Sequence, residues 1–389
     1  MSQQAIARVS RRAAGRWQRG HPWIYRSDVT AAPDVAAGAV RVLDEQGRFL
    51  GRALWSPTSQ ISLRMLTSDD RAIDTGFWRE RISAAVSYRE TLHIAGSAYR
   101  LIHGEADGMP SLVVDKYGDY LVAQFLSAGL EAFRADIVNA LRERVAARGL
   151  LARNDPAVRG HEQLPQTTEL LYGEVPEQVE VREADVRYLA APWKGQKTGA
   201  FLDQRENRVR AGQLAHGRTL DCFSYHGSFT MHLAAHAESV QAVDASYEAL
   251  ERAEVNAQLN GFENVELIEA NAFEYLRHQE SQRETYDLIV VDPPAFAKRR
   301  DAVKQALRGY KEINLRAMRL LAPGGYLCSF SCSFHVNAGM FREMLESAAA
   351  DSGRQLRWIE TRGQALDHPE IVQIPESSYL KGAILQAGS

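Results

Sequence analysis

Residues 219–236 read TLDCFSYHGSFTMHLAAH, which is a short apolar run, a polar turn and a helix-like segment in succession. The same order recurs downstream, because four further apolar runs of strand length follow and helix-like segments separate most of them. The runs are SVQAVDA, VELIEAN, YDLIVVDPP and GGYLCSFSCS, and the helix-like segments include YEALERAEVNAQLNG and AFEYLRHQ. Strands that alternate with helices are typical of βαβ units. The sequence from about residue 184 onward therefore predicts an α/β domain with a doubly wound parallel sheet.

The first 70 or so residues have a different rhythm. Residues 38–55, GAVRVLDEQGRFLGRALW, alternate apolar and polar side chains around an EQGR turn, and residues 60–66 read as one more strand. Alternation with a period of two is the pattern of a half-buried strand, since successive side chains point to opposite faces. This part of the chain therefore predicts a small β-rich domain.

The middle of the chain mixes helices and strands. Residues 77–92 have helical spacing of their apolar side chains, and residues 99–126 read as strands joined by glycine turns. Residues 130–150 form a second amphipathic pattern, and we expect that helix to end at Gly149. We therefore expect three domains: a β-rich domain over 1–72, a central α+β linking domain over 73–183 and the doubly wound domain over 184–389.

Composition indicates the class of protein. A length of 389 residues with 45% hydrophobic residues is enough to bury more than one core. The chain has no apolar run of about 18 residues, and its N-terminal residues lack the apolar stretch of a signal peptide. Three cysteines, an odd number in a long chain, do not suggest a disulfide framework. We therefore expect a cytoplasmic protein with no membrane partner.

Charge is segregated along a chain whose net charge is only -3. Residues 1–26 contain no acidic residue, and they carry six arginines: Arg8, Arg11, Arg12, Arg16, Arg19 and Arg26. A second basic cluster follows the run YDLIVVDPP: Lys298, Arg299, Arg300, Lys304, Arg308 and Lys311. Basic patches on a mildly acidic protein can attract a polyanion such as nucleic acid. Ordinary solvated arginine runs are the alternative interpretation.

Candidate binding residues follow the predicted strands, because ligands of doubly wound sheets bind beyond the carboxyl ends of the strands. Asp221 and Gly227 belong to a turn that lets a ligand approach the backbone, but no G-x-G-x-x-G or P-loop is present. Asp244 can accept both hydroxyls of a ribose. Residues 271–273 offer an amide and an aromatic face for adenine, and the prolines after Asp292 stiffen a loop. Each feature alone fits a turn or a cap, but the four in order favour S-adenosylmethionine as cofactor.

These residues resemble the ordered motifs of class I S-adenosylmethionine-dependent methyltransferases. A sharper match is KTGAFLDQRENR at 197–208, which with four other stretches is similar to the bacterial ribosomal large-subunit RNA methyltransferase I family of cytosine-C5 methyltransferases. The other stretches are GHPWIYRSDV at 20–29, LIHGEADGMPSLVVDKYGDYLV at 101–122, SCS at 331–333 and PESSYLKG at 375–382. The resemblance implies an N-terminal PUA RNA-binding domain and a C-terminal Rossmann-like methyltransferase domain. It also implies 23S ribosomal RNA or a large-subunit assembly intermediate as partner, and it allows a homodimer.

The strand ends and the resemblance together give a set of expected cofactor-binding residues: Phe201, Asp203, Gln204, Arg205, Asp221, Phe223, Ser224, Gly227, Asp244, Ala245, Asn271, Ala272, Phe273, Asp292 and Pro293. Three positions depart from the family's pattern, namely His226 and Ser228 in the first loop and Asn271 where an aspartate is usual. The amide of Asn271 can still donate to adenine, but it cannot act as a charged acceptor.

Cysteine chemistry matches the implied reaction. The C5 carbon of cytosine is a poor nucleophile, and attack of a thiolate at C6 makes C5 an enamine-like carbon that can accept a methyl group. Cys222 and Cys328 lie inside apolar runs, where a free cysteine is usually a core residue, whereas Cys332 follows the last run. With the resemblance, we expect Cys332 to be the nucleophile. Asp292 is the expected companion, which would hydrogen-bond the cytosine amino group or N3, while the base that releases the product is not identified.

Two other functions stay open at this point. An enzyme of the same fold could methylate a nitrogen, such as guanine N7, because Asp-Pro-Pro also resembles the loop of amino methyltransferases, and such an enzyme would not need Cys332. An RNA-binding assembly factor with little catalysis is the other alternative. His232 and His236 have the spacing of a zinc pair, but without a third ligand we expect no metal. The tryptophans at 17, 23 and 55 could stack on bases or belong to a core.

Overall fold

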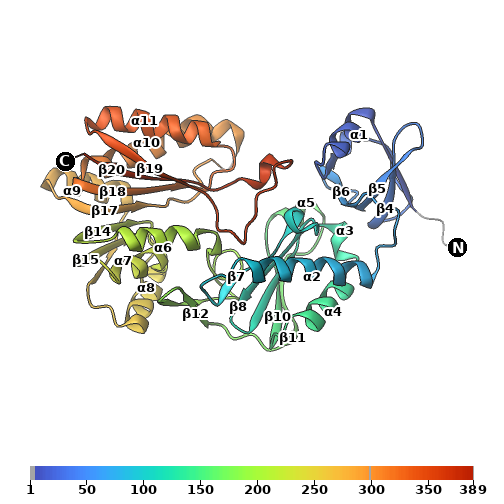
Figure 1. Ribbon diagram of the computed structural model, residues 1–389, viewed down its shortest axis with the longest axis horizontal. Helices are drawn as coiled ribbons and strands as arrows, with labels where there is room; N and C mark the ends of the chain where they lie inside the picture. The colour runs from blue at the N-terminus through green and yellow to red at the C-terminus, as the bar shows by residue number, and fades with distance from the viewer. Residues whose placement is uncertain (1–4, 298, 389) are drawn as a thin grey trace. The chain divides into compact units, whose positions relative to one another are not determined.

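The computed structural model describes residues 5–297 and 299–388, and the chain divides into two compact units (Figure 1). The first unit contains the residues up to 181 together with 190–202 and 366–377. The second contains 182–189, 203–365 and the residues from 378 onward. Among the described residues, no helix combines the length and the apolarity that crossing a membrane requires. Lys298 of the second basic cluster lies outside the described residues.

A six-stranded sheet and helix α1 (Arg11–Gln18) form the N-terminal part of the first unit. The strand order is β2-β6-β5-β4-β1-β3, with β1 (Ile6–Val9), β2 (Trp23–Tyr25), β3 (Val29–Ala31), β4 (Gly38–Leu43), β5 (Phe49–Trp55) and β6 (Ile61–Thr67). Strands β4 and β5 pair antiparallel across the predicted turn, so the β-rich assignment is confirmed. Trp17 and Trp55 are buried in the core of this sheet, whereas Trp23 is half-buried and donates its Nε1–H to Glu105 at 2.8 Å.

A five-stranded sheet forms the central part of the first unit, with the order β11-β10-β9-β8-β7. Only β9 and β10 pair in parallel, and the other neighbours are antiparallel. The strands are β7 (Ala98–His103), β8 (Leu112–Tyr117), β9 (Tyr120–Phe125), β10 (Gly149–Asn154) and β11 (Thr167–Gly173). The helices of this part are α2 (Thr75–Thr91), α3 (Ala128–Glu131), α4 (Arg134–Arg144) and α5 (Val158–His161).

The predicted end of the second central helix was wrong. Helix α4 ends at Arg144, and Gly149 instead begins strand β10, where it pairs with Gly173 of β11. A Cβ atom on Gly149 would lie 2.0 Å from the carbonyl oxygen of Glu174. Glycine is required here because the backbones of two segments approach closely, and not because it terminates a helix.

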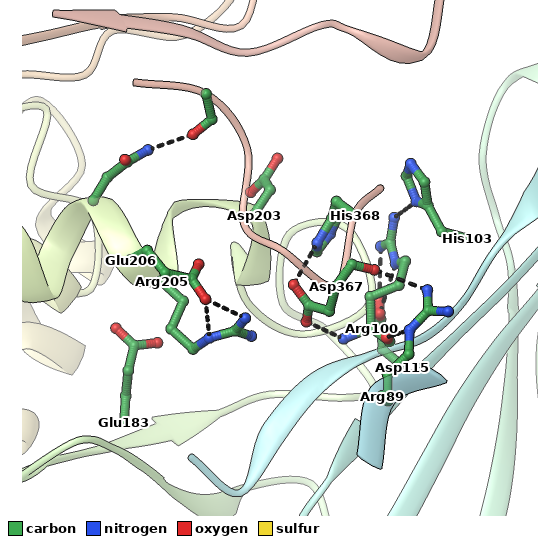
Figure 2. A network of polar contacts seen from close by, with 12 residues as sticks. Arg89, Arg100, His103, Asp115, Glu183, Asp203, Arg205, Glu206, Asp367 and His368 are labelled. Carbon is green, nitrogen blue, oxygen red and sulfur yellow. Dashed lines mark hydrogen bonds and ion pairs between the residues drawn. The ribbon is translucent and has the colours of Figure 1, made fainter. Parts of the chain in front are cut away.

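Two segments from later in the sequence belong to the first unit. The hydroxyls of Tyr117 and Thr198 are hydrogen-bonded at 2.9 Å. Figure 2 shows the attachment of the other segment, in which the Asp367 carboxylate accepts from the backbone N–H of Arg100 at 2.7 Å. The carbonyl oxygen of Asp367 accepts from the buried guanidinium of Arg89 at 2.9 Å. Buried polar contacts, rather than proximity in sequence, therefore attach these segments to the unit.

A seven-stranded sheet with the order β16-β15-β14-β17-β18-β20-β19 forms the centre of the second unit. The strands are β14 (Arg218–Cys222), β15 (Ser239–Asp244), β16 (Val265–Glu269), β17 (Tyr286–Val291), β18 (Leu321–Ser331), β19 (Leu356–Arg362) and β20 (Lys381–Ala387). The five strands from β14 to β18 are parallel, as predicted, and β20 and β19 extend the sheet antiparallel. The strand order reverses beside β14, which is the position where doubly wound sheets bind ligands. Strands β12 (Val179–Glu183) and β13 (Val186–Ala190) form a separate two-stranded sheet.

Helices cover both faces of the seven-stranded sheet, with α10 and α11 on one face and α6 and α7 on the other (Figure 1). In β17, Ile289 and Val291 pack in the first of these cores, whereas Leu288 and Val290 pack in the second. The run YDLIVV is apolar throughout because both of its faces are covered. The helices of this unit are α6 (Arg205–Leu214), α7 (Ser228–Ala234), α8 (Tyr247–Asn260), α9 (Ala272–Gln282), α10 (Val303–Arg319) and α11 (Ala338–Ser352).

Candidate active site

The parallel strands of the second unit bring the predicted strand-end residues to one edge of the sheet. Asp221 is the second-to-last residue of β14, and Asp244 is the last residue of β15. Asn271 follows β16 by two residues, Asp292 directly follows β17, and Cys332 directly follows β18. Because the carboxyl ends of parallel strands share an edge, residues scattered over more than 100 positions of the sequence lie along the same boundary.

The loop after β14 has an unusual backbone. Phe223, Tyr225 and Gly227 all have positive φ, at 66°, 50° and 79°. The backbone N–H of Phe223 donates to the carbonyl oxygen of Val243 at 2.9 Å, which holds the loop against β15. A Cβ atom on Gly227 would lie 3.0 Å from the Cβ of Ala253, so this position favours glycine both for its φ and for its packing. Such sparsely populated conformations concentrate at ligand-binding loops.

Two buried oxygen atoms of this region have no hydrogen-bond partner among the described residues: Oδ1 of Asp221 and Oγ of Ser224. The other carboxylate oxygen of Asp221 accepts from the hydroxyl of Thr230 at 2.7 Å. Burial raises the pKa of Asp221 to about 7, and the negative charges of Asp292 and Asp244 act in the same direction. A cationic group beside Oδ1 would satisfy the oxygen and favour the ionised carboxylate.

Asp244 is fixed at the end of β15 by two backbone donors. Its Oδ2 accepts from the N–H of Tyr225 and its Oδ1 from the N–H of Ser246, both at 2.9 Å. The side chain is half-buried, and the following Ala245 is exposed. Each carboxylate oxygen can accept a second hydrogen bond, so the pair can still receive two hydroxyl groups from a ligand.

Aromatic rings gather beyond the ends of β14 and β16. The rings of Phe223 and Phe273 are 6.5 Å apart and nearly perpendicular, and Phe296 lies 6.0 Å from Phe273. Asn271 begins helix α9, and its side-chain oxygen accepts from the N–H of Phe273 at 2.9 Å. The oxygen of Asn271 is therefore used as a helix cap, which leaves the amide nitrogen for the donor role expected from the sequence. Ala272 is buried in the first turn of the same helix.

A chain of amide groups orients Asp292. The side-chain N–H of Gln204 donates to Oδ1 of Asp292 at 2.9 Å, and Asn207 donates to the Gln204 oxygen at 2.6 Å. The guanidinium of Arg362 then donates to the Asn207 oxygen at 3.0 Å. Gln204, Asn207 and Asp292 are thus linked by direct contacts, so the Gln204 side chain is used to hold a carboxylate. Pro293 is buried beside it.

The remaining residues of the stretch 197–208 have separate partners. Asp203 is buried and accepts from the hydroxyl of Tyr379 at 2.8 Å. Arg205 forms an ion pair with the adjacent Glu206 at 2.6 Å (Figure 2). Phe201 belongs to the first unit, where Lys197 Nζ lies 4.7 Å from the centre of its ring. The structure therefore brings Asp203 to Arg205 into the second unit with the strand-end residues, whereas Phe201 is not part of that unit.

The serines on each side of Cys332 are both buried and hold the segment in place. The Ser333 hydroxyl accepts from the backbone N–H of Ala297 at 3.1 Å and is hydrogen-bonded to the Tyr310 hydroxyl at 2.8 Å. The N–H of Ser333 donates to the hydroxyl of Ser331 at 3.4 Å. These contacts join the end of β18 to helix α10 and to the loop after β17, so the position of Cys332 is set by its neighbours.

Exposure separates the three cysteines. Cys222 and Cys328 are fully buried in strands, as predicted, and Cys332 is partly exposed. Burial raises the pKa of the Cys328 thiol to about 12 and raises that of Cys222 further. Neither buried thiol can therefore supply a thiolate near neutral pH.

His232 and His236, which have the spacing of a zinc pair in the sequence, lie in different environments. His232 is buried and hydrogen-bonded to Glu183 at 2.9 Å, whereas His236 is exposed at the end of α7. Within the described ranges, no group of three His, Cys, Asp or Glu side chains is arranged to hold a metal ion. His232 therefore belongs to a buried polar cluster.

Two protein families match different parts of the chain. Residues 7–68 match the PUA-like domain, and residues 99–384 match the S-adenosylmethionine-dependent methyltransferase family. The protein named ribosomal RNA large subunit methyltransferase I from Shewanella amazonensis is 40% identical over 376 residues, which cover 94% of this chain and 95% of that protein. The protein of the same name from Tolumonas auensis is also 40% identical, and the match covers 95% of this chain and 96% of that protein.

The chain belongs to the ribosomal RNA large subunit methyltransferase I family. The fold class and the cofactor expected from the sequence are thereby confirmed: members of this family are S-adenosylmethionine-dependent, and the protein is a methyltransferase of large-subunit ribosomal RNA with an N-terminal PUA-like domain. The positions of the domain boundaries at 72 and 183 remain a prediction.

Solved structures share the fold of this methyltransferase I family member. A protein from Streptococcus mutans described as a SAM-dependent methyltransferase aligns with a TM-score of 0.83 and 21% identity, covering 98% of this chain and 99% of that one. A structure described as a methyltransferase complexed with SAH aligns with a TM-score of 0.85, again at 21% identity, and covers 98% of this chain and 99% of that one. Because these two structures are only 21% identical to this chain, the alignments show similarity of fold and nothing further.

Several residues around the site were not foreseen. Asn207 lies inside the stretch KTGAFLDQRENR, and Lys381 lies inside PESSYLKG, so the motifs that gave the resemblance contained both. Arg362 and Phe296 lie outside those stretches, and no local pattern connects either of them with Asp292 or Phe273. Their positions follow from the pairing of β19 with β20 and from the loop after β17.

Proposed function

We propose that the protein forms 5-methylcytosine in 23S ribosomal RNA through a covalent bond between Cys332 and C6 of the target base. The observation that carries this proposal is the partly exposed thiol of Cys332 at the sheet edge that also holds Asp221 and Asp292. An enzyme that methylates a nitrogen has no need of a thiol at this edge. The target cytosine would leave its stack to reach the thiol, as bases do in other enzymes that act on them.

The proposed chemistry begins at the thiolate of Cys332. The sulfur forms a bond to C6, and the π electrons of the C5–C6 bond shift toward C5 and the ring. Bound S-adenosylmethionine would supply an electrophilic methyl group, which C5 would take up as the sulfonium C–S bond breaks and its electron pair stays on the cofactor sulfur. Loss of the C5 proton to a base then restores the C5–C6 double bond, and the C6–S bond breaks with its electron pair returning to Cys332. The thiolate is regenerated at the end of the cycle.

Asp292 is proposed to hydrogen-bond the cytosine amino group or N3 and so hold the base while C6 is attacked. Its orientation is supported by the Gln204 amide at 2.9 Å, which Asn207 holds in turn. We assign Gln204 to this positioning role in addition to the cofactor contact expected from the sequence. A carboxylate held by a fixed amide loses little freedom when the base binds, which favours a defined geometry.

The cofactor is proposed to bind at the ends of β14 to β16. Oδ1 of Asp221 and Oγ of Ser224 are the buried oxygens that fit the cationic amino group of S-adenosylmethionine. Asp244 fits the ribose hydroxyls, and the edge between Phe223 and Phe273 fits the adenine ring. The further contacts expected from the sequence, at Phe201, Asp203, Arg205, Gly227, Ala245, Asn271, Ala272 and Pro293, stay predictions.

Asp244→Asn should weaken S-adenosylmethionine binding about tenfold or more, because a charged acceptor contributes about 1.5–3 kcal/mol to a hydrogen bond with a hydroxyl. Isothermal titration calorimetry measures the change. Glu269→Gln is the matched control, since Glu269 ends the neighbouring strand β16 in register with Asp244 and is exposed. Equal affinities for the two variants would remove Asp244 from the cofactor site.

The product of the reaction tests the function itself. Ribosomal RNA from a strain that lacks the gene should be incubated with the protein and S-adenosylmethionine and then digested to nucleosides. Mass spectrometry is expected to find one additional 5-methylcytidine in the large-subunit RNA. Methylation of guanine N7 instead would contradict the C5 proposal and keep the family assignment, whereas cofactor binding without any methylated product would favour an assembly factor.

RNA docking is proposed to use the N-terminal arginines. Of the six, Arg16 is half-buried and the other five are exposed, and both Arg12 and Arg16 form an ion pair with Asp28. Exposed arginines bind phosphates by releasing counterions from RNA. The choice between naked 23S RNA and an assembly intermediate in the cytoplasm, and the homodimer allowed by the resemblance, stay parts of this proposal.

A further inference from the structure

Lys381 is a buried lysine at the start of β20, which lies beside the end of β18 where Cys332 follows. Its side chain is 7% exposed, and it pairs with Ser331 across the antiparallel strands β18 and β20. Its Nζ donates to the carbonyl oxygen of Ser333 at 2.7 Å and to that of Tyr379 at 2.8 Å. Lysine is almost never buried without a charged partner, because removing the ammonium from water is costly.

The partner of Lys381 is not a carboxylate. Within residues 5–297 and 299–388, no acidic side chain lies within ion-pair distance of its Nζ. Burial lowers the pKa of Lys381 to about 8, and the negative charge of the Cys332 thiolate opposes this shift. An ammonium group has three donors, and the two carbonyl oxygens account for two of them. The third proton of the charged form is therefore the one available to an anion.

We propose that the Lys381 side chain holds the Cys332 sulfur as a thiolate in a thiolate–ammonium pair. The S–H bond breaks and its electron pair stays on Sγ. The proton moves to the lone pair of Nζ where Lys381 is neutral, and to water where Lys381 is already an ammonium. No reactant other than water is needed. The consequence for catalysis rests on the proposed C5 mechanism, in which Cys332 must attack as a thiolate, but the ion pair itself exists without RNA or cofactor.

The surroundings determine the direction of the pH dependence. Tyr310 of helix α10 interacts electrostatically with Cys332, and burial raises the pKa of its phenol, so it stays neutral near pH 8. Asp292 follows the neighbouring strand β17, and its carboxylate accepts from Gln204. An adjacent ammonium favours the thiolate, so the midpoint of Cys332 ionisation should lie below the ordinary value of a free thiol, about 8.5. The thiolate persists at lower pH with Lys381 than without it.

The rate at which iodoacetamide alkylates Cys332 in the full chain tests this proposal, because only the thiolate reacts. The modified peptide is identified by mass spectrometry, which separates Cys332 from the two buried cysteines. In Lys381→Met we expect the midpoint of the rate–pH profile to rise by about one unit or more, with alkylation at pH 7 about tenfold slower. Lys381→Arg keeps the positive charge and should retain most of the rate. Lys304→Met removes the same charge from an exposed position and should behave as the wild type.

Two outcomes would overturn the proposal. One is an unchanged profile in a folded Lys381→Met protein. The other does not depend on the folding of a Lys381 variant. It is an ionisation midpoint of Cys332 at or above the ordinary value of a free thiol, measured as the 240 nm thiolate absorbance of the wild type minus that of Cys332→Ser. Neither readout involves methyl transfer. An altered profile without 5-methylcytosine formation would therefore contradict the proposed function alone, and an unchanged profile with product formed would contradict the ion pair alone.

Discussion

Cys332→Ser should lower methyl transfer to RNA on the order of a thousandfold or more, while S-adenosylmethionine still binds with unchanged affinity. A serine hydroxyl at neutral pH is far less ionised than a thiol and cannot form the adduct at C6 at a useful rate. The substitution is nearly isosteric, and Cys332 is partly exposed, so the fold should be unaffected. Transfer of a radiolabelled methyl group to ribosomal RNA measures activity, and calorimetry measures cofactor binding.

RNA with 5-fluorocytosine at the target position separates a nucleophile from a cysteine that only lies nearby. Fluorine at C5 cannot leave as a proton, so the adduct cannot resolve and the wild-type protein should be trapped covalently on the RNA. Cys328→Ser is the matched control, because it changes a cysteine four residues away that is fully buried, and it should still be trapped. Full activity in a folded Cys332→Ser protein would contradict the C5 mechanism and favour methylation of a nitrogen.

The largest effect on stability is expected at Glu183. This side chain is 2% exposed, and its carboxylate accepts from Arg208 at 2.6 and 2.5 Å and interacts with His232 at 2.9 Å. Burial alone would raise the pKa of Glu183, but Arg208 and His232 outweigh burial and lower it to about 2. Glu183→Gln should destabilise the second unit by about 3–5 kcal/mol, because the buried Arg208 guanidinium loses the carboxylate to which it donates two hydrogen bonds.

Differential scanning calorimetry should detect this loss as a fall in the unfolding temperature of about 10 °C. Glu254→Gln removes a carboxylate from an exposed position of α8 and is expected to have almost no effect. The pKa of Glu183 in the folded protein lies below its ordinary value of 4.5. Its contribution is therefore complete above about pH 4.5 and is lost as the pH falls toward 2, so the wild type and the variant should converge on acidification. A constant difference between them would contradict this role of Glu183.

Local sequence patterns were sufficient to predict most of the strands and helices of the second unit. The runs that contain Asp221, Asp244 and Asp292 became neighbouring parallel strands, because apolar runs bounded by polar turns form buried strands and the intervening amphipathic segments cover them. The same patterns distinguished Cys332 from Cys328, since burial follows from a place inside an apolar run. Motif resemblance added the family, which no pattern of periodicity could have supplied.

Other features depended on contacts between distant segments. The role of Gly149 required knowledge of β11, and the choice between core and surface for Trp17 and Trp55 required the packing of the N-terminal sheet. The sequence suggested Gln204 as a cofactor residue, but its 2.9 Å contact with Asp292 joins positions 88 residues apart. No window of neighbouring residues contains that information.

The sequence by itself therefore determined the doubly wound sheet, the order of its strand-end residues and the cysteine most suited to act as a nucleophile. These properties depend on hydrophobic periodicity and on where each strand ends, both of which are local. Only the tertiary structure decided what surrounds that cysteine: the serines that fix it, and the buried Lys381 that the antiparallel pairing of β20 with β18 brings beside it from 49 positions further along the chain. The charge state of a side chain depends on its burial and on charges within a few ångströms, and these follow from strand pairing and not from the residues adjacent in sequence.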